Sequence, residues 1–558
     1  MVNIAKHYDA IVVGSGASGS FAAMELTKQG LNVLLLEAGK DITPDDFPTD
    51  SKGPKEKGIQ LWARARATLT GQPQQAKVAF YGQQQRHLFV NDFEHPYSTP
   101  KSSPFLFIRG KQLGGRLHTF GRMLLRWSDA DFKAADNDGY GESWPISYAD
   151  IAPYYDEIET FLGVRGNEDH VSAVPDGKYV GPSYLTQSEK DFKQSIETNW
   201  NDRKAIAWRY MPPNIKRIPQ PILAAKETGN LTIRTDAVVR QVLTDKESGK
   251  ASGVEFVDRH TKESHQISAS LIMLCASPIE STRLLMNSVS SKHPKGLGNS
   301  SNQLGKYFMD QVPSILMGTV SGKTGFEIDD SPLDPDPFYG RSGGVYIPRF
   351  ENINGNKTND FIRGYAFQGT VGRLFVQPGK ATRYAFMGFG EMLPHADNTI
   401  ALHSTKKDRW GVPIPHVTCD MKQNEKAMLT HQTTAMKSMA KAAGLDIEFS
   451  GSYTGLEEQG TGAFPEADWF SRMLFRKTLT KSLCMGAAIH ESGGARMGSD
   501  PESSVLNQFN QCWDSPNVFV TDASSFRTGG SAGTTLTVMA LTIRASRYAA
   551  EQLKAGTL

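Results

Sequence analysis

The sequence predicts an α/β + β fold, in which a parallel sheet with flanking helices is interleaved with a domain built on an antiparallel sheet. The first observation is the apolar run from Ala10 to Val13, which leads directly into a glycine-rich turn and a helical segment, as in an α/β unit. The second is the stretch from about 311 to 470, where short β-like runs alternate with Gly, Pro and Asn turns. The third is the return of α/β character after it, which ends in a helix from Leu536 to Leu553. This order predicts two interleaved domains.

The N-terminal turn from Gly14 to Gly19 has the features of a site for a dinucleotide pyrophosphate. Gly14 permits the tight turn out of the strand, and Gly16 lets the backbone approach the pyrophosphate. Gly19 lets the following helix pack closely against the sheet. That helix, predicted from Ser18 to Gln29, directs its N-terminal N–H groups and its positive dipole end at the phosphates.

The chain continues with Gly30, which favours the end of the helix, and with a second apolar strand from Val33 to Leu36 that leads into Glu37. Glu37 lies about 20 residues past the glycines, where an acid hydrogen-bonds a ribose hydroxyl. Strand, helix, second strand and acid in this order indicate a Rossmann-type unit. An acid here disfavours a 2′-phosphate and therefore NADP, but the motif alone does not separate FAD from NAD.

The middle of the chain predicts further elements of the same unit. Residues 41–104 are polar and rich in Gln, Lys and Pro, which predicts either a plain surface insertion or a lid or partner surface. A second glycine-rich turn, from Arg109 to Arg116, allows the backbone to lie flat against a ligand. The other elements expected are a helix at Asp150 to Leu162, strands at Asn230 to Arg234, Ala237 to Val239, Gly253 to Val257 and Ser270 to Ala276, and a helix at Ile279 to Asn287.

Composition and charge exclude several classes of protein. The 558 residues are 39% hydrophobic and 22% charged, with a net charge of +2, which gives no electrostatic case for nucleic acid or an anionic membrane. The four cysteines lie far apart without a CxxC spacing, which argues against a metal site, an iron–sulfur cluster or a disulfide framework. No run of about 18 apolar residues predicts a transmembrane helix, and the N-terminus lacks an apolar signal core. By its own sequence the polypeptide is expected to be cytoplasmic.

A second motif lies near the C-terminus, where His490 precedes the pair Gly493-Gly494 and a strand from Val518 to Val520 leads towards Asp522. Histidine suits a general base because its unperturbed pKa lies close to working pH. Taken alone, His490 is equally compatible with a hydrogen-bonded core histidine. Together with the dinucleotide turn, the motif indicates a flavin enzyme.

Several motifs, in the same order as in the family, show that the chain resembles the glucose–methanol–choline (GMC) flavoprotein oxidoreductases over nearly its whole length. They are Gly14 to Gly19 with Glu37, Leu113 to Gly115, Asp138 to Trp144 with Ile151 to Tyr155, Ala276 to Ser281, Leu304 to Asp310, His490 to Gly498 with Asp522, and Leu536 to Ala540. Within the family, the chain is most similar to the bacterial sugar and glycoside dehydrogenases of the pyranose-oxidase-like branch.

The resemblance implies FAD as the cofactor and His490 as the active-site base facing the flavin. It implies that the turn residues Gly14, Gly16, Ser18 and Gly19 contact the pyrophosphate and that Glu37 binds the adenosine ribose. It further implies a backbone contact of Val238 to the adenine end, and it places Gly114, Gly115 and Asp522 beside the isoalloxazine or the pyrophosphate.

Two departures from the family pattern matter. The second active-site residue of the family, a histidine or asparagine before a proline, falls on Gly533, and the proline falls on Thr534. We therefore expect Thr534, or a side chain from the second domain, to help orient the substrate hydroxyl. The histidine that carries covalent flavin in some relatives falls on Thr119, one residue after His118, so non-covalent FAD is expected.

The predicted boundaries follow these motifs. We expect the FAD-binding domain to comprise 1–50, 101–160, 225–310 and 475–558, the substrate-binding domain 161–224 and 311–474, and the insertion 51–100. In the substrate domain, Gln368 and His395 are candidate sugar-binding groups, although an ordinary surface or turn position explains either one. Turns of hairpins are expected at Asp397-Asn398 and at Asp408 to Gly411, with Trp410 as a packing residue.

The resulting prediction is FAD-dependent oxidation of a secondary hydroxyl of a sugar or glycoside, with carbon 3 as the position. The electrons would pass to a separate acceptor such as a c-type cytochrome, and a small subunit that carries an export signal would allow a periplasmic location. The alternatives are an oxidase that uses oxygen and a flavin-binding protein without catalysis, to which only the loss of the histidine or asparagine at Gly533 points.

Overall fold

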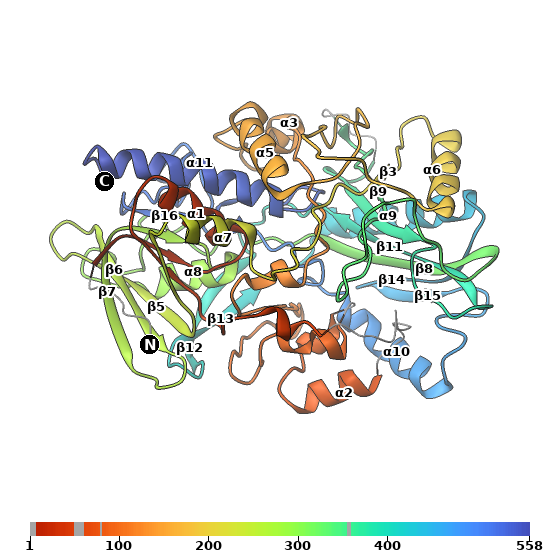
Figure 1. The fold of residues 1–558 in the computed structure, drawn as a ribbon, viewed down its shortest axis with the longest axis horizontal. Coiled ribbons are helices and arrows are strands. Elements are labelled where there is room, and N and C mark those ends of the chain that lie inside the picture. Colours follow the sequence, from red (N-terminus) through yellow and green to blue (C-terminus); the bar gives the residue numbers. More distant parts are fainter. Residues whose placement is uncertain (1–6, 49–60, 79–80, 354–358) are drawn as a thin grey trace.

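Two sheets organise the chain in the computed structural model, which describes residues 7–48, 61–78, 81–353 and 359–558. In Figure 1 the first sheet lies in the left half of the molecule and the second in the right half. Each sheet has seven strands within the described part of the chain. The first is largely parallel and the second wholly antiparallel, which confirms the predicted α/β + β fold.

The first sheet has the strand order β4-β2-β1-β7-β6-β5, with β16 also paired to β7. Its strands are β1 (His7–Val13), β2 (Val33–Leu36), β4 (Leu231–Arg234), β5 (Ala237–Thr244), β6 (Ala251–Asp258), β7 (Ser264–Leu274) and β16 (Val518–Val520). The register aligns Val13 with Leu36 on one side and with Leu274 on the other. The carboxyl ends of three parallel strands therefore meet at one edge, where ligands bind in open α/β sheets.

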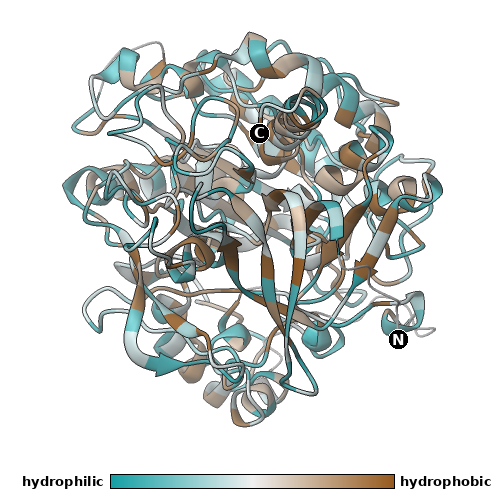
Figure 2. Ribbon diagram, turned by 90° about the vertical axis from the view of Figure 1, so that its left-hand side faces the viewer, coloured by the Kyte–Doolittle hydropathy of each residue, from teal (hydrophilic) through white to brown (hydrophobic). Residues whose placement is uncertain are grey.

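Helices cover this sheet. Those that pack around its first βα unit are α1 (Ala17–Lys28), α5 (Tyr148–Leu162), α7 (Gln220–Glu227) and α11 (Thr535–Lys554), while α8 (Pro278–Asn287) packs against β5. The helix α1 differs from the expected span by one residue at each end, and Gly30 follows it with φ +83°, which a side chain would disfavour. Figure 2 shows hydrophobic residues along the central strands and hydrophilic residues on the outer loops.

The second sheet has the order β15-β14-β8-β11-β10-β9-β3. Its strands are β3 (Ile206–Ala207), β8 (Val312–Thr324), β9 (Val345–Ile347), β10 (Tyr365–Val371), β11 (Ala381–Gly390), β14 (Leu445–Ser452) and β15 (Gly455–Glu458). The helix α9 (Gln423–Ala442) packs across β8, β10, β11 and β14, and α6 (Gln187–Asn199) packs against α9 and β10. This sheet forms one side of the cavity described below.

A separate hairpin, β12 (Thr399–Lys407) and β13 (Pro413–Thr418), packs against α8 of the first sheet. Its turn lies at Asp408 to Val412, where Asp408 donates its backbone N–H to the Val412 carbonyl at 2.9 Å, as expected. Trp410 is buried with Val238 and Val257. The hairpin turn predicted at Asp397-Asn398 is wrong, because β11 and β12 belong to different sheets.

The remaining helices are α2 (Leu61–Leu69), α3 (Asp129–Phe132), α4 (Ala134–Asp138) and α10 (Trp469–Ser482). The first ten residues of the predicted insertion, 51–60, lie outside the described residues. Residues 79–80 also lie outside the described residues. In its described part, a buried cluster joins Ala67 and Val78 to Ile108 and Cys484. None of the helices in the described ranges is long and apolar enough to cross a bilayer. The exact domain ranges stay a prediction.

Candidate active site

One cavity of about 650 Å³ receives residues from both sheets. Its wall includes the turn between β1 and α1, the strands β10 and β11, the segment before His490 and the start of α11. Of the predicted site residues, those that line it are Gly14, Gly16, Ser18, Glu37, Gly115, Val238, Gln368, His490, Asp522, Gly533 and Thr534. Gly19 and Gly114 are not part of the lining. The fold therefore brings the N-terminal turn and the C-terminal histidine to one cavity.

The three glycines of the N-terminal turn have different surroundings. Gly14 has φ +97°, and a Cβ there would lie 2.6 Å from the carbonyl oxygen of Cys275. A Cβ on Gly19 would lie 1.8 Å from the carbonyl oxygen of Gly14, so the packing of α1 excludes any side chain. A Cβ on Gly16 would meet nothing within 4 Å. Gly14 and Gly19 are thus required by the chain itself, whereas Gly16 keeps space open in the cavity.

The N-terminus of α1 is free to receive an anion. Gly16 is the N-cap residue, no side chain caps the helix, and its first turn carries no acidic residue. The hydroxyl of Ser18 is hydrogen-bonded to those of Thr521 and Thr542 at 2.8 and 3.1 Å, which ties the start of the helix to the end of β16 and to α11. The uncapped N–H groups and the helix dipole therefore fit a pyrophosphate.

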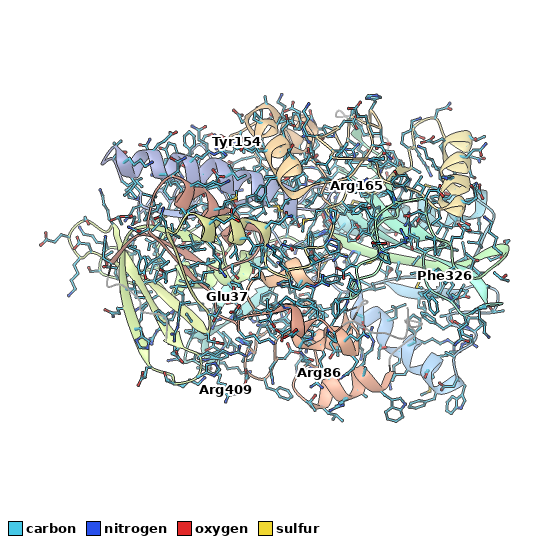
Figure 3. The ribbon with its side chains drawn as sticks, in the orientation of Figure 1. Glu37, Arg86, Tyr154, Arg165, Phe326 and Arg409 are labelled. Atoms are coloured by element: carbon cyan, nitrogen blue, oxygen red, sulfur yellow. The ribbon has the colours of Figure 1, made fainter. Side chains whose placement is uncertain are left out.

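Glu37 follows β2 inside the molecule (Figure 3) and accepts three hydrogen bonds from the protein. They come from the hydroxyl and backbone N–H of Ser15, at 2.5 and 3.2 Å, and from the Gly39 N–H at 2.8 Å. A carboxylate offers about four acceptor positions, so one remains for a ribose hydroxyl. Burial raises the pKa of Glu37. The Ser15 hydroxyl, which donates to Glu37, also accepts a hydrogen bond from the Gly114 N–H at 2.9 Å. Ser15, which sequence reasoning missed, thus links the two glycine-rich turns.

Asp522 follows β16 at the same edge of the first sheet. Its carboxylate accepts hydrogen bonds from the Ser281 hydroxyl and from the Ser524 N–H, and burial raises its pKa. Val238 lines the cavity from β5. Both positions agree with the cofactor contacts that the family resemblance implies, although their roles stay predictions.

His490 is held in one tautomer by Gln311, a residue that the sequence did not single out. The side-chain amide of Gln311 donates to the carbonyl oxygens of Gly530 and Ala532 at 2.7 and 3.1 Å. Its Oε1 is consequently turned towards His490 Nδ1, at 2.5 Å. Because an amide oxygen only accepts, Nδ1 carries the hydrogen and Nε2 has the free lone pair.

The electrostatic environment keeps His490 neutral. Burial, with a contribution from the positive charge of Arg116, lowers the pKa of His490 to about 4. The His490 backbone N–H donates to Asp310 at 2.9 Å, and the Gly486 N–H donates to the other oxygen of Asp310 at 2.7 Å. Burial raises the pKa of Asp310 to about 7, and the charge of Glu491 adds to that increase. A neutral imidazole with a free Nε2 is a competent proton acceptor.

The residues at which the chain departs from the family pattern, Gly533, Thr534 and Thr119, all line the cavity. A Cβ on Gly533 would lie 3.8 Å from His490 Nε2, so a family histidine or asparagine there would project next to the base. His118 Nε2 is 2.8 Å from the Leu113 carbonyl oxygen, and burial lowers the pKa of His118 to about 4.

The two candidate sugar-binding residues differ in position, because only one of them lines the cavity. Gln368 lines the cavity from β10, and its register partner Met387 lines it from β11 together with Phe389. His395 does not line it, because its ring nitrogens are engaged with Glu425 at 3.1 Å and Tyr140 at 2.9 Å.

All four cysteines are buried and free. Within the described ranges, no group of three or more His, Cys, Asp or Glu side chains is placed to hold a metal ion.

This arrangement places a dinucleotide-type turn and a neutral histidine in one cavity, and comparison with known proteins gives the family. Two family models, both described as GMC oxidoreductase, match residues 8–312 and 394–542. The chain therefore belongs to the GMC oxidoreductase family, and FAD is its cofactor. The free N-terminus of α1, the open position at Gly16 and the remaining acceptor position of Glu37 fit that cofactor.

Two characterised relatives match along nearly the whole chain. The 2-methyl-1,2-propanediol dehydrogenase of Mycolicibacterium austroafricanum is 27% identical, over 98% of this chain and 96% of its own. The fructose dehydrogenase large subunit of Gluconobacter japonicus is 24% identical, over the full length of both chains. A crystal structure of formate oxidase covers 100% of this chain and 99% of its own with a TM-score of 0.64 at 15% identity, which shows the shared fold.

Proposed function

We propose that this protein oxidises a secondary ring hydroxyl of a sugar or glycoside to a ketone, at carbon 3, and passes the electrons to a separate acceptor. The observation that carries this proposal is the neutral His490, whose free Nε2 belongs to the same cavity as the dinucleotide turn. The carbon-3 position rests on the branch of the family that the sequence resembles.

The proposed roles of the chain's residues follow from the proton balance. Oxidation of an alcohol removes a proton from oxygen and a hydride from carbon, and FAD bound in the cavity would supply the hydride acceptor. His490 Nε2 takes the hydroxyl proton as general base. Gln311 stabilises the resulting imidazolium through Nδ1–H, and the carbonyls of Gly530 and Ala532 hold Gln311 in position.

We propose that Thr534 and Gln368 replace the family's second histidine or asparagine in orienting the substrate. Both line the cavity, one at the start of α11 and the other on the second sheet. The Thr534→Val variant should retain flavin and lose activity about tenfold, the effect of about one hydrogen bond to the reacting group. Full activity of this variant would remove Thr534 from the mechanism.

We further propose that the acceptor is a protein partner, a small subunit together with a c-type cytochrome. The relative from Gluconobacter japonicus is itself named as a large subunit. In this chain, α2 exposes 85% of Trp62 and 81% of Leu69, and α10 exposes 75% of Trp469. Exposed apolar side chains of this size fit a protein interface. Export together with such a subunit would place the complex in the periplasm.

A panel of glycosides tests the proposed function. The holoenzyme should oxidise at least one glycoside with a dye as electron acceptor and much more slowly with oxygen alone, and NMR should locate the new ketone at carbon 3. Rapid turnover with oxygen would favour the oxidase of the same family. A flavin that no member of a wide sugar and alcohol panel reduces would favour the non-catalytic alternative.

A further inference from the structure

Arg122 occupies an unusual position in the wall of the cavity. It follows the turn of the second glycine-rich segment and lines the cavity together with Trp208, Gln368 and His490. Only 8% of the residue is exposed, and its guanidinium lies 4.2 Å from the centroid of the Tyr339 ring. Its backbone has φ +60°, a conformation that is unfavourable for a non-glycine residue and is enriched at ligand sites.

The guanidinium of Arg122 has no ion-pair partner among the described residues. Its Nε is buried without a hydrogen-bond partner, and Nη2 reaches only the hydroxyl of Ser342, at 3.5 Å. Among the described residues, no carboxylate lies within 4.0 Å of the guanidinium. Asp336, whose charge acts on Arg122, is itself held by both terminal nitrogens of Arg217 at 2.8 and 3.0 Å.

The other arginines near this wall have acidic partners. Arg116 binds Glu491 at 2.6 Å, and Arg341 lies 3.5 Å from Asp329. A buried guanidinium without a counter-charge is strongly disfavoured unless a ligand supplies one. The planar fork of arginine matches the two oxygens of a carboxylate and also binds a phosphate. An anionic group on a ligand would supply the partner that Arg122 lacks.

We propose that Arg122 binds an oxyanion on the substrate, so that the preferred substrate is a sugar or glycoside that carries an acidic group. The carboxylate of a uronic acid is the group that best matches the fork. This inference rests on the proposed function, since it assigns the substrate class of the same cavity. It makes Arg122 a specificity-determining residue that contacts substrate, with no part in the removal of the proton.

Binding is measured first, on holoenzyme whose flavin has been chemically reduced under anaerobic conditions, so that no sugar is oxidised during the titration. Calorimetric titration of the holoenzyme compares D-glucuronate, glucose 6-phosphate and D-glucose at constant ionic strength. Glucuronate should bind at least tenfold more tightly than glucose, and Arg122→Gln should abolish that difference. The control, Lys216→Gln, removes an exposed cation that lies outside the cavity lining and should bind glucuronate like the wild type.

Steady-state kinetics give a second readout. With a glucuronide, Arg122→Gln should raise KM by about 10- to 100-fold and leave kcat within about twofold, which corresponds to about 1.4 to 2.8 kcal/mol. The matched neutral glucoside, which lacks the group that the fork binds, should show a much smaller rise in KM. Arg122→Lys, which keeps the charge but not the fork, should give an intermediate KM and covers the case in which the glutamine variant does not fold.

The outcomes separate this inference from the proposed function. Equal affinity of the wild type for glucuronate and glucose, or equal losses in the Arg122 and Lys216 variants, would overturn the inference. Tighter binding of glucose 6-phosphate than of glucuronate would keep Arg122 as the anion-binding residue. It would overturn the assignment of a carboxylate as the group that Arg122 binds. Glucuronate binding that depends on Arg122, without oxidation of any sugar, would refute the proposed function and leave the anion site standing.

Discussion

The two ends of the cavity are built in different ways. The nucleotide end, lined by Gly14, Gly16 and Glu37, comes from a single βαβ stretch near the N-terminus. The reaction end is lined by Gln368, His490 and Gly533, and Gln311 holds His490. These four residues come from segments that are far apart in the sequence. Local backbone geometry determines the first end, whereas the second exists only after both sheets have packed.

The two ends also differ in the forces that maintain them. At the nucleotide end, backbone atoms of Gly14, Gly19 and Cys275 approach so closely that side chains are excluded. At the reaction end, a chain of hydrogen bonds runs from the carbonyls of Gly530 and Ala532 through Gln311 to His490. Substitutions at the first end should therefore disturb folding and cofactor binding, and those at the second should disturb the chemistry.

The largest effect is expected within the nucleotide end, from Gly19→Ala compared with Gly16→Ala. The added methyl group at Gly19 would lie 1.8 Å from a carbonyl oxygen, so α1 must shift and the apo protein should unfold at a clearly lower temperature. At Gly16 the methyl group meets nothing within 4 Å, so the apo protein should keep its melting temperature but bind FAD much more weakly. Thermal unfolding and FAD titration of both apo proteins test this, and similar melting temperatures would contradict it.

The next effect concerns the base of the reaction end. His490→Asn removes the proton acceptor and should lower kcat by about 10²- to 10⁴-fold, while the flavin absorbance per protein stays at the wild-type value. His395→Asn is the matched control, because its ring lies outside the cavity lining. A loss of less than tenfold in the His490 variant would show that another group takes the proton.

Gln311 tests the tautomer of that base. Gln311→Leu removes the acceptor for Nδ1–H, so both tautomers become populated, and kcat should fall about tenfold, the effect of one lost hydrogen bond to a group that becomes charged. Gln311→Glu restores an acceptor and, by its negative charge, should move the acid limb of the rate profile to higher pH. Equal activity of the wild type and the leucine variant would remove Gln311 from the mechanism.

The smallest effect is the pH dependence set by Arg116. Neutral His490 is the active form and its pKa is about 4, so kcat/KM should be flat near neutral pH and fall tenfold per pH unit below about pH 4. Arg116→Met removes a positive charge that lowers this pKa, so the fall should begin at higher pH. An unchanged profile would show that burial alone sets the value.

The same ionisation gives a stability signature. The folded pKa of His490 lies below the ordinary value of 6.5, so between about pH 4 and 6.5 the unfolded state binds more protons than the folded state. The contribution of His490 to the free energy of unfolding therefore rises with pH across that window and is lost as the pH falls through it.

The sequence predicted the nucleotide end well because each of its requirements is local. The strand β2 has the expected bounds, Val33 to Leu36, and Glu37 follows it directly. The sequence also predicted His490 as a site residue, from its glycine neighbours and the family motif. Gln311, Arg116 and Arg122 were not predicted as site residues, because nothing adjacent in the sequence distinguishes a glutamine that orients a histidine or an arginine without a counter-charge. Only the packing of the second sheet against the first reveals them, just as it shows that His395 serves a hydrogen-bond network instead.

The most direct test of the account is the visible absorbance spectrum of the purified protein under anaerobic conditions, before and after the addition of neutral and acidic glycosides. We expect oxidised-flavin bands that a glycoside bleaches within the time of mixing in the wild type, and that the His490→Asn variant retains for at least a hundred times longer. Oxidised-flavin bands that bleach equally fast in both proteins would contradict the role of His490. A protein without flavin bands, even after incubation with FAD, would contradict the assignment of the whole cavity.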